Sequence, residues 1–311
     1  MKLAFLFPGQ GAQYVGMGQD LVEGYRVARE TFAEADRALG WDLSGLCFHG
    51  PEARLQETEY TQPAILAHSV ACWRVVAEYG LRADYLAGLS LGEYTALVTA
   101  GSLDFATALQ LVQRRGRYMQ EAVPLGQGSM AAVMGLDRDD VEQICAMAQG
   151  LVAPANYNCP GQIVISGETQ AVQEAGRLAL ARGAQRVVPL AVSAPFHSVL
   201  MQPAADRLAG DLAQVEMSPW QVPVIANVNA QPYQTVADLV PGLVAQVVSP
   251  VRWEDSMRLL LAEGVQVFVE LGPGRTLAGF LRKLNRDVQV FSVSDLKTLQ
   301  KLLDFVSEGL L

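Results

Sequence analysis

The sequence predicts an α/β protein in which a large domain with a parallel sheet is interrupted by a smaller inserted unit. Short apolar runs alternate with helical patterns along the first part of the chain, which is typical of a parallel sheet covered by helices. Between residues 127 and 192 the order becomes βαββαβ, the ferredoxin-like arrangement. We therefore expect a discontinuous large domain, 1–126 and 193–311, around a ferredoxin-like subdomain, 127–192.

The first part of the large domain opens with an apolar run that Pro8 and Gly9 end, as expected of a buried strand before a turn. Pro63 falls in the first turn of a later helical pattern, where proline is tolerated. The expected elements are a strand over 2–7, helices over 19–39 and 61–79, a strand over 84–87, and helices over 91–100 and 103–123.

The inserted unit has its own start and stop signals. Asp137 offers an N-cap for a helix that runs to Gln149, and Gly183 is a plausible residue just past the end of the second helix. The expected strands cover 130–134, 152–157, 162–166 and 186–192, and the second helix covers 169–182.

The large domain then resumes with the same alternation of apolar runs and helical patterns. We expect a helix over 199–215, a strand over 222–227, helices over 236–247 and 253–263, a strand over 265–270, and a helix from Leu296 to the C-terminus.

The composition excludes several classes of protein. Half of the 311 residues are hydrophobic and 18% are charged, so a sizeable core is feasible and global disorder is excluded. The formal charge of −9 argues against a general nucleic-acid binder. No stretch approaches the length of a membrane span. The scattered cysteines and histidines give no zinc spacing, so we expect no metal site and a cytoplasmic protein.

The pentapeptide Gly88-Leu89-Ser90-Leu91-Gly92 has the G-x-S-x-G spacing of a serine presented for nucleophilic attack. Its glycines allow a sharp turn between strand and helix, and the helix start points N–H groups at an oxyanion. Chance produces such a pentapeptide in roughly one protein of this composition in seven. The strand before it and the helix after it make Ser90 the candidate nucleophile and the large domain α/β-hydrolase-like.

A serine hydroxyl is a poor nucleophile unless a base takes its proton. His197 is the single histidine downstream of Ser90 and lies where the chain re-enters the large domain, and a crevice between domains commonly holds a site. His68 falls inside a helical pattern, which favours a packed or surface residue, and His49 lies in a predicted loop. Chain order excludes neither of them. His197 is the candidate base.

Arg115 lies on the apolar stripe of its predicted helix, three residues after Val112 and four before Met119. A guanidinium on a buried face needs an anionic partner, because an unpaired buried charge is costly. From the residues alone, that partner is either an internal Asp or Glu or a carboxylate of the substrate. Arg114 and Arg117 lie off the stripe and are expected to be solvated.

Gln10 stands between two glycines directly after the first strand. The loop matches neither G-x-G-x-x-G nor the P-loop, so neither nucleotide signature is met. Its glycines either hold a backbone N–H toward an active centre or simply permit a tight turn.

Several short motifs stand out as a set: Phe7-Pro8-Gly9-Gln10-Gly11-Ala12-Gln13, Gly88-Leu89-Ser90-Leu91-Gly92-Glu93-Tyr94, Gln113-Arg114-Arg115-Gly116, Ala155-Asn156-Tyr157-Asn158, Pro160-Gly161-Gln162, Phe196-His197-Ser198, Ser249-Pro250-Val251-Arg252-Trp253 and Glu270-Leu271-Gly272-Pro273-Gly274. Together they resemble malonyl-CoA:acyl carrier protein transacylases and the acyltransferase domains of polyketide synthases. The resemblance covers most of the chain in order.

This resemblance implies a two-step exchange with no bound cofactor. Ser90, activated by His197, attacks the thioester of malonyl-CoA and becomes a malonyl ester, which the phosphopantetheine thiol of an acyl carrier protein then takes. Arg115 is implied to hold the malonate carboxylate, so a substrate carboxylate becomes its expected partner. The oxyanion donors fall on the backbone N–H groups of Gln10 and Leu91.

In the family a backbone carbonyl orients the histidine, and by motif that carbonyl falls on Gln246; a neutral acceptor suffices to fix the imidazole tautomer. Phe196 resembles the malonyl-selective members, because a bulky ring leaves little room for an α-methyl group. Leu89 departs from the many members that carry His there. Leucine resembles the freestanding, trans-acting acyltransferases, which favours a polyketide role over a housekeeping fatty-acid role.

The expected partner is a separate, transiently bound acyl carrier protein, and carrier proteins are usually acidic. The basic run from Arg282 to Arg286, with Arg114 and Arg117, is a candidate docking surface, and a plain solvated face is the alternative. Besides the acyl-CoA we expect no nucleic-acid or membrane partner, and we expect the chain to act as a monomer.

Two rival functions belong to other classes. A serine hydrolase of the α/β-hydrolase type needs an acid followed by a late histidine, whereas no histidine follows His197. A catalytically silent scaffold that binds carrier proteins is the second rival.

Overall fold

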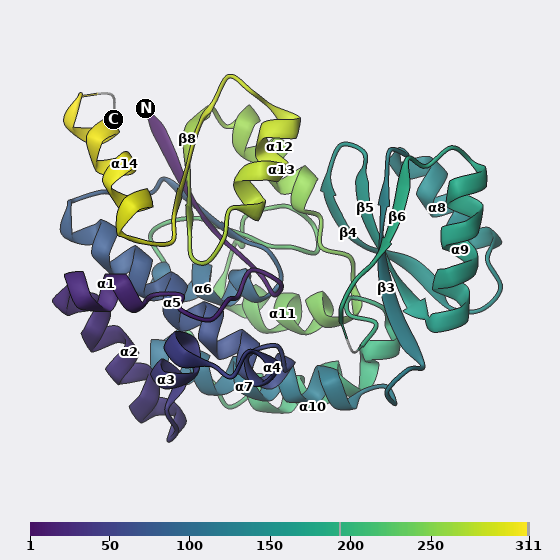
Figure 1. Ribbon diagram of the computed structural model, residues 1–311, viewed down its shortest axis with the longest axis horizontal. Coiled ribbons are helices and arrows are strands. Elements are labelled where there is room, and N and C mark those ends of the chain that lie inside the picture. The colour runs from purple at the N-terminus through teal and green to yellow at the C-terminus, as the bar shows by residue number, and fades with distance from the viewer. Residues whose placement is uncertain (193, 310–311) are drawn as a thin grey trace.

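The computed structural model describes residues 1–192 and 194–309. Its larger body, on the left in Figure 1, is built on a five-stranded parallel sheet with strand order β7-β2-β1-β8-β9. The strands are β1 (Lys2–Phe7), β2 (Tyr85–Gly88), β7 (Val224–Ile225), β8 (Val265–Leu271) and β9 (Gln289–Val293).

The helices of this body are α1 (Gln19–Gly24), α2 (Arg26–Leu39), α3 (Leu43–His49), α4 (Glu52–Leu55), α5 (Thr58–Glu78), α6 (Leu91–Thr99), α7 (Phe105–Glu121), α10 (Gln202–Leu212), α11 (Leu239–Val248), α12 (Trp253–Ala262), α13 (Thr276–Leu284) and α14 (Leu296–Ser307), with short 3-10 turns η1 (Val199–Met201) and η2 (Val236–Asp238). They cover both faces of the sheet. Phe5 and Phe7 of β1 belong to the core formed with α5, α6 and α7, whereas Ala4 and Leu6 belong to the core formed with α12 and α13. Alternate side chains of a strand point to opposite faces, so β1 is buried on both.

The smaller body, on the right in Figure 1, is a four-stranded antiparallel sheet with order β4-β5-β3-β6. Its elements are β3 (Gly128–Met134), α8 (Arg138–Met147), β4 (Val152–Cys159), β5 (Gln162–Glu168), α9 (Thr169–Ala181) and β6 (Arg186–Pro189). Both helices cover the outer face of the sheet (Figure 1). Asp137 caps α8 as predicted, since its side chain accepts from the backbone N–H of Asp140 (2.9 Å).

The predicted fold class is confirmed: the chain has a parallel sheet covered by helices and a separate, small antiparallel sheet in the βαββαβ order. The domain bounds at 1–126, 127–192 and 193–311 stay predictions. Residue 193 and residues 310–311, which those bounds include, lie outside the described residues.

Several predicted elements differ in extent. The helix predicted over 19–39 breaks at Tyr25, whose backbone is extended, and the missing side chain of Gly24 lets Leu296 of α14 approach closely there. The strand predicted over 222–227 shrinks to β7, where Pro223 has no N–H to give to a ladder. The helix predicted over 199–215 starts as η1 and continues as α10, and the one predicted over 236–247 starts as η2 and continues as α11.

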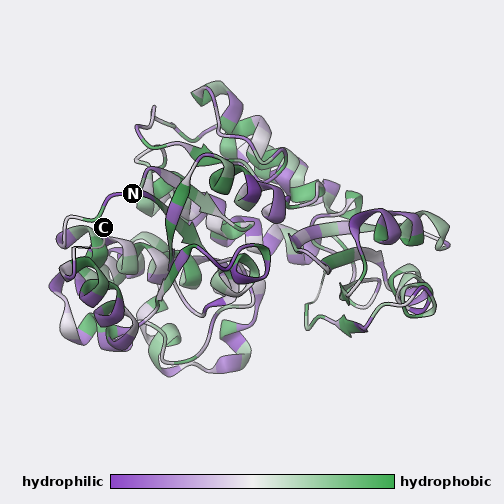
Figure 2. Cartoon of the chain, turned by 90° about the horizontal axis from the view of Figure 1, so that it is seen from above, coloured by the Kyte–Doolittle hydropathy of each residue, from purple (hydrophilic) through white to green (hydrophobic). Residues whose placement is uncertain are grey.

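Four elements were not predicted: α3, α4, α13 and β9. The first two are short, and β9 is a half-buried edge strand without a clear apolar alternation. Figure 2 shows hydrophobic residues along the central strands and mixed colours on the outer helices, as expected of helices that bury one face.

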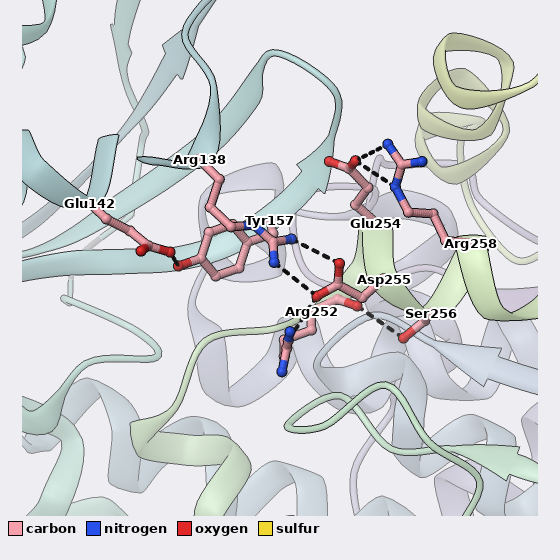
Figure 3. Close-up of polar contacts among 8 residues, drawn as sticks. All are labelled: Arg138, Glu142, Tyr157, Arg252, Glu254, Asp255, Ser256 and Arg258. Atoms are coloured by element: carbon pink, nitrogen blue, oxygen red, sulfur yellow. Dashed lines mark hydrogen bonds and ion pairs between the residues drawn. The ribbon is translucent and has the colours of Figure 1, made fainter. Parts of the chain in front are cut away.

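The two bodies are joined by main-chain and ionic contacts beside β4. The N–H of Tyr157 donates to the carbonyl oxygen of Val251 (2.9 Å), and Asn156 forms a parallel bridge with Val251 of the larger body. Beside it, Arg138 of α8 makes two hydrogen bonds to the carboxylate of Asp255 in α12 (2.9 and 3.2 Å), and its guanidinium lies over the Tyr157 ring (Figure 3). These contacts set the position of the small sheet against the large one.

Candidate active site

Ser90 occupies the sharp turn between β2 and α6. Its backbone has φ 54° and ψ −105°, a combination that costs a non-glycine residue roughly 1–3 kcal/mol. Gly88 and Gly92 make the turn possible, because a Cβ on Gly88 would collide with the backbone of Gly92, and a Cβ on Gly92 would collide with the backbone of Phe7. The predicted strand–turn–helix context of the G-x-S-x-G motif is therefore present.

The hydroxyl of Ser90 lies 2.8 Å from Nε2 of His197. The other ring nitrogen, Nδ1, lies 2.8 Å from the backbone carbonyl oxygen of Gln246, so Nδ1 carries the proton and Nε2 is free to accept one. His197 is buried, and burial lowers its pKa to about 4, with the charge of Arg115 acting in the same direction. The imidazole is consequently neutral near pH 7 and able to act as a base.

Arg115 lies on the buried stripe of α7, as predicted, with 1% of its surface exposed. Its Nη1 donates to Oε1 of Gln62 (2.8 Å), and its Nη2 donates to Oε1 of Gln246 (3.0 Å) and to Oγ of Ser90 (3.1 Å). Among the described residues no Asp or Glu forms an ion pair with it. The guanidinium therefore presents a positive charge directly at the nucleophile.

Gln10 and Leu91 follow two neighbouring strands, β1 and β2, and line the same cavity as Ser90. Gln10 follows β1 and Leu91 is the first residue of α6, whose N–H has no partner within the helix. Within residues 1–192 and 194–309, neither N–H donates to another protein group. Both residues line the same cavity as Ser90, where the two N–H groups are available for an oxyanion.

The cavity at Ser90 measures about 370 Å³ and lies between the two bodies. The larger body contributes the residues described above together with Leu89, and Phe196 and His197 lie where the chain returns to that body. The inserted unit contributes Met130 of β3, Asn156 of β4 and Leu190, which directly follows β6. Phe196 is 7% exposed and forms part of the cavity wall, so its ring limits the space beside the nucleophile.

Four residues of the site were not predicted from the sequence. Asn227 holds the turn on both sides of Ser90: its Oδ1 accepts from the N–H of Ser90 (2.6 Å), and its Nδ2 donates to the carbonyl oxygen of Gly88 (2.7 Å). The others are Gln62, which accepts from Arg115; Glu93, which accepts from the Gln246 amide that contacts Arg115; and Tyr233, which donates to Glu93. The available signal was Glu93, the one charged residue of helix α6.

The other candidates lie apart from this site. His68 is fully buried in α5, where its Nε2 lies 3.1 Å from the carbonyl oxygen of Ser294 and burial lowers its pKa to about 4. His49 ends α3 rather than lying in a loop, and it lines a different pocket. Arg282 and Lys283 are exposed at the end of α13.

Arg114 and Arg117 are exposed, as predicted for residues off the apolar stripe, and Arg114 pairs with Asp211 (3.3 Å). Across the described part of the chain, no group of three or more His, Cys, Asp or Glu side chains is placed to hold a metal ion. No helix in that part is long and apolar enough to cross a bilayer.

The chain is similar to known proteins in both sequence and structure. A family model described as acyl transferase domain matches residues 4–301. The chain is 46% identical over 310 residues to a malonyl CoA-acyl carrier protein transacylase of Bacillus subtilis (99% of this chain, 98% of the relative). It is 47% identical over 287 residues to the protein of that name in Escherichia coli K12 (91% and 93%).

Two solved structures are similar over nearly the full length. The malonyl CoA-acyl carrier protein transacylase (fabD) of Coxiella burnetii is 41% identical with a TM-score of 0.96, covering 98% of this chain and 97% of that one. The second, described as a type II PKS acyl-carrier protein in complex with its malonyl-transacylase, is 44% identical with a TM-score of 0.96, covering 98% and 99%.

Proposed function

The chain belongs to the acyl transferase family, and on that premise we propose that it moves a malonyl group from malonyl-CoA to the phosphopantetheine thiol of an acyl carrier protein through an ester on Ser90. Exchange of an acyl group between two thiols needs no redox or metal chemistry, so the proposal includes no bound cofactor. The chain would act as a monomer with a transiently bound carrier.

In the first half-reaction the Ser90 hydroxyl attacks the thioester carbonyl carbon while Nε2 of His197 takes its proton. The N–H groups of Gln10 and Leu91 stabilise the negative oxygen of the tetrahedral intermediate. The intermediate collapses to the malonyl ester, and the departing coenzyme A thiolate takes the proton back from His197. The carbonyl oxygen of Gln246 keeps the imidazole in the required tautomer throughout.

The second half-reaction reverses these steps with a different thiol. The carrier's phosphopantetheine thiol gives its proton to His197 and attacks the ester carbonyl carbon. The same two N–H groups hold the oxyanion, and Ser90 leaves as its oxygen regains the proton from His197. The enzyme is thereby returned to its starting state.

The observation that carries the proposal is that one atom, Oγ of Ser90, contacts both a base and a buried cation. His197 lies 2.8 Å away and Arg115 lies 3.1 Å away. An acyl group with a carboxylate close to its thioester can therefore react at Ser90 while that carboxylate pairs with Arg115. Malonyl has this arrangement, and the Phe196 ring leaves little room for a substituent on its central carbon.

Intact-mass measurement after incubation with malonyl-CoA tests the covalent step. We expect one malonyl adduct on the wild-type chain, none on Ser90→Ala, and loss of the adduct when a holo carrier protein is added. An equal adduct on Ser90→Ala contradicts the assignment of the nucleophile. Release of free malonate without transfer to the carrier supports the rival serine hydrolase, and the absence of any adduct supports the silent scaffold.

For the pathway, we propose a housekeeping role on a fatty-acid carrier, because bacterial relatives named malonyl CoA-acyl carrier protein transacylase match over nearly the whole chain. A polyketide carrier is the second candidate. It is favoured by Leu89 and by the solved relative in complex with a type II PKS carrier. Transfer rates to one carrier of each kind, measured in parallel, decide between them: the preferred carrier is the one with the higher kcat/KM.

A further inference from the structure

We propose that Glu93 is a positioning residue whose carboxylate fixes the orientation of the Gln246 side-chain amide and, through that amide, holds Arg115 ready for the carboxylate of the acyl group. The proposal rests on the proposed function, in which Arg115 receives that carboxylate. It assigns a specificity role to a side chain that does not itself line the cavity described above.

Glu93 is fully buried in α6, one turn after Ser90. Its Oε1 accepts a hydrogen bond from the hydroxyl of Tyr233 (2.5 Å), and its Oε2 accepts from Nε2 of Gln246 (2.5 Å) and from the backbone N–H of Asn227 (3.3 Å). Burial raises the pKa of this carboxyl to about 7, and its three hydrogen bonds and the charge of Arg115 oppose that rise. These donors make a buried carboxylate tolerable at this place.

The amide of Gln246 has a donating end and an accepting end, and its neighbours permit one orientation. Nε2 faces two acceptors, the carboxylate of Glu93 and the carbonyl oxygen of Ser90 (3.0 Å). Oε1 then faces Nη2 of Arg115, which can only donate (3.0 Å). If the amide were reversed, Nε2 would face the guanidinium donor against donor, and Oε1 would face two acceptors. Glu93, together with the carbonyl oxygen of Ser90, therefore orients the amide so that Arg115 finds an acceptor beside the nucleophile.

Glu93 also acts through a second set of hydrogen bonds. Its carboxylate accepts from the backbone N–H of Asn227, and the side chain of Asn227 accepts from the backbone N–H of Ser90. This second set acts on the nucleophile itself, so we expect it to affect every acyl group alike. Gln246 contacts both the carbonyl oxygen of Ser90 and Arg115, and only its contact with Arg115 is expected to favour acyl groups that carry a carboxylate. The ratio of malonyl to acetyl transfer therefore isolates the role proposed for Gln246 and Glu93.

The test measures malonyl and acetyl transfer from their coenzyme A thioesters to a holo carrier protein by the wild type, Glu93→Met and Glu93→Gln. Methionine has a similar size but offers Gln246 no oxygen acceptor. Glutamine can place its oxygen toward Gln246 and its NH₂ toward the Tyr233 hydroxyl, which can accept. We expect Glu93→Met to lower the malonyl-to-acetyl ratio by about tenfold or more, and Glu93→Gln to keep it within about threefold.

Gln246→Met is the second variant, because it removes the amide but keeps the backbone carbonyl that binds His197. The same fall in the ratio is expected, so the proposal stays testable if Glu93→Met does not fold. An unchanged ratio in the methionine variants overturns the proposal, as does a fall in Glu93→Gln as large as in Glu93→Met, which would assign the effect to charge. A wild type that transfers no malonyl overturns the proposed function, and this role of Glu93 with it.

Discussion

Replacing Arg115 by alanine is expected to separate malonyl from acetyl transfer. Each Nη nitrogen carries two protons. Both on Nη2 are used, by Gln246 and Ser90, and one on Nη1 is used by Gln62. A malonyl carboxylate can take the free Nη1 proton and replace Ser90 on Nη2. The pair of Arg115 and the carboxylate then has two charge-assisted hydrogen bonds, each of about 1.5–3 kcal/mol. In exchange, Arg115 loses the weaker hydrogen bond from Nη2 to the neutral Ser90 hydroxyl.

A net gain of about 3 kcal/mol corresponds to a factor of roughly 10² in rate. We therefore expect Arg115→Ala to lower kcat/KM for malonyl-CoA about 10²-fold more than for acetyl-CoA, measured as transfer to a holo carrier. Because the two substrates report on the same folded enzyme, any loss of stability cancels in the ratio. Arg114→Ala is the matched control: its side chain lies on the same helix but is 48% exposed, and we expect no change in the ratio. Equal losses for both acyl groups in Arg115→Ala would refute the reasoning and make Arg115 a structural residue.

Three further predictions concern the base, the turn and its glycines. The pKa of His197 is lowered from 6.5 to about 4, so its imidazole stays neutral as the pH falls through 6. The rate of Ser90 acylation, measured by quench-flow, should therefore be nearly the same at pH 5.5 as at pH 7.5. With an imidazole of ordinary pKa that rate would fall about tenfold over this range. Asn227→Ala should lower malonyl and acetyl transfer by the same factor, about 30-fold for about 2 kcal/mol, and a selective loss of malonyl transfer would contradict its placement. Gly92→Ala should lower the free energy of unfolding by more than about 3 kcal/mol in urea titrations, whereas Gly210→Ala, with open space around its Cβ in α10, should raise it slightly.

The fold class could be predicted from the sequence because the spacing of apolar residues within each helix or strand is a property of neighbouring residues. The alternating strands and helices of the larger body and the βαββαβ order of the smaller one follow from runs of neighbouring residues. The break at Tyr25 could not be predicted in this way. Beside this break Gly24 lies close to Leu296, a residue far away along the chain whose approach no local pattern shows.

The site residues likewise fall into those that local sequence identifies and those that depend on distant segments. Ser90 and Arg115 could be identified locally, one from the spacing of its glycines and the other from its place on an apolar stripe. The hydrogen bonds of Asn227 and of the Gln246 side chain could not, because an amide carries no signal of its partner until distant segments meet. The role of the Gln246 carbonyl was available only from the family resemblance, and the structure places that oxygen 2.8 Å from His197.

The bridge between Asn156 and Val251, together with the Arg138–Asp255 ion pair beside it, holds the inserted unit to the larger body in addition to its two chain connections. A unit held only by its two chain connections can move relative to the larger body, whereas this unit must break these additional contacts to do so. Met130, Asn156 and Leu190 line the cavity from this attached unit, so we expect the width of the cavity to limit the size of the acyl group. We therefore expect a larger acyl group to fit only when cavity-lining side chains are replaced by smaller ones. The contacts between the inserted unit and the larger body should be kept in such variants.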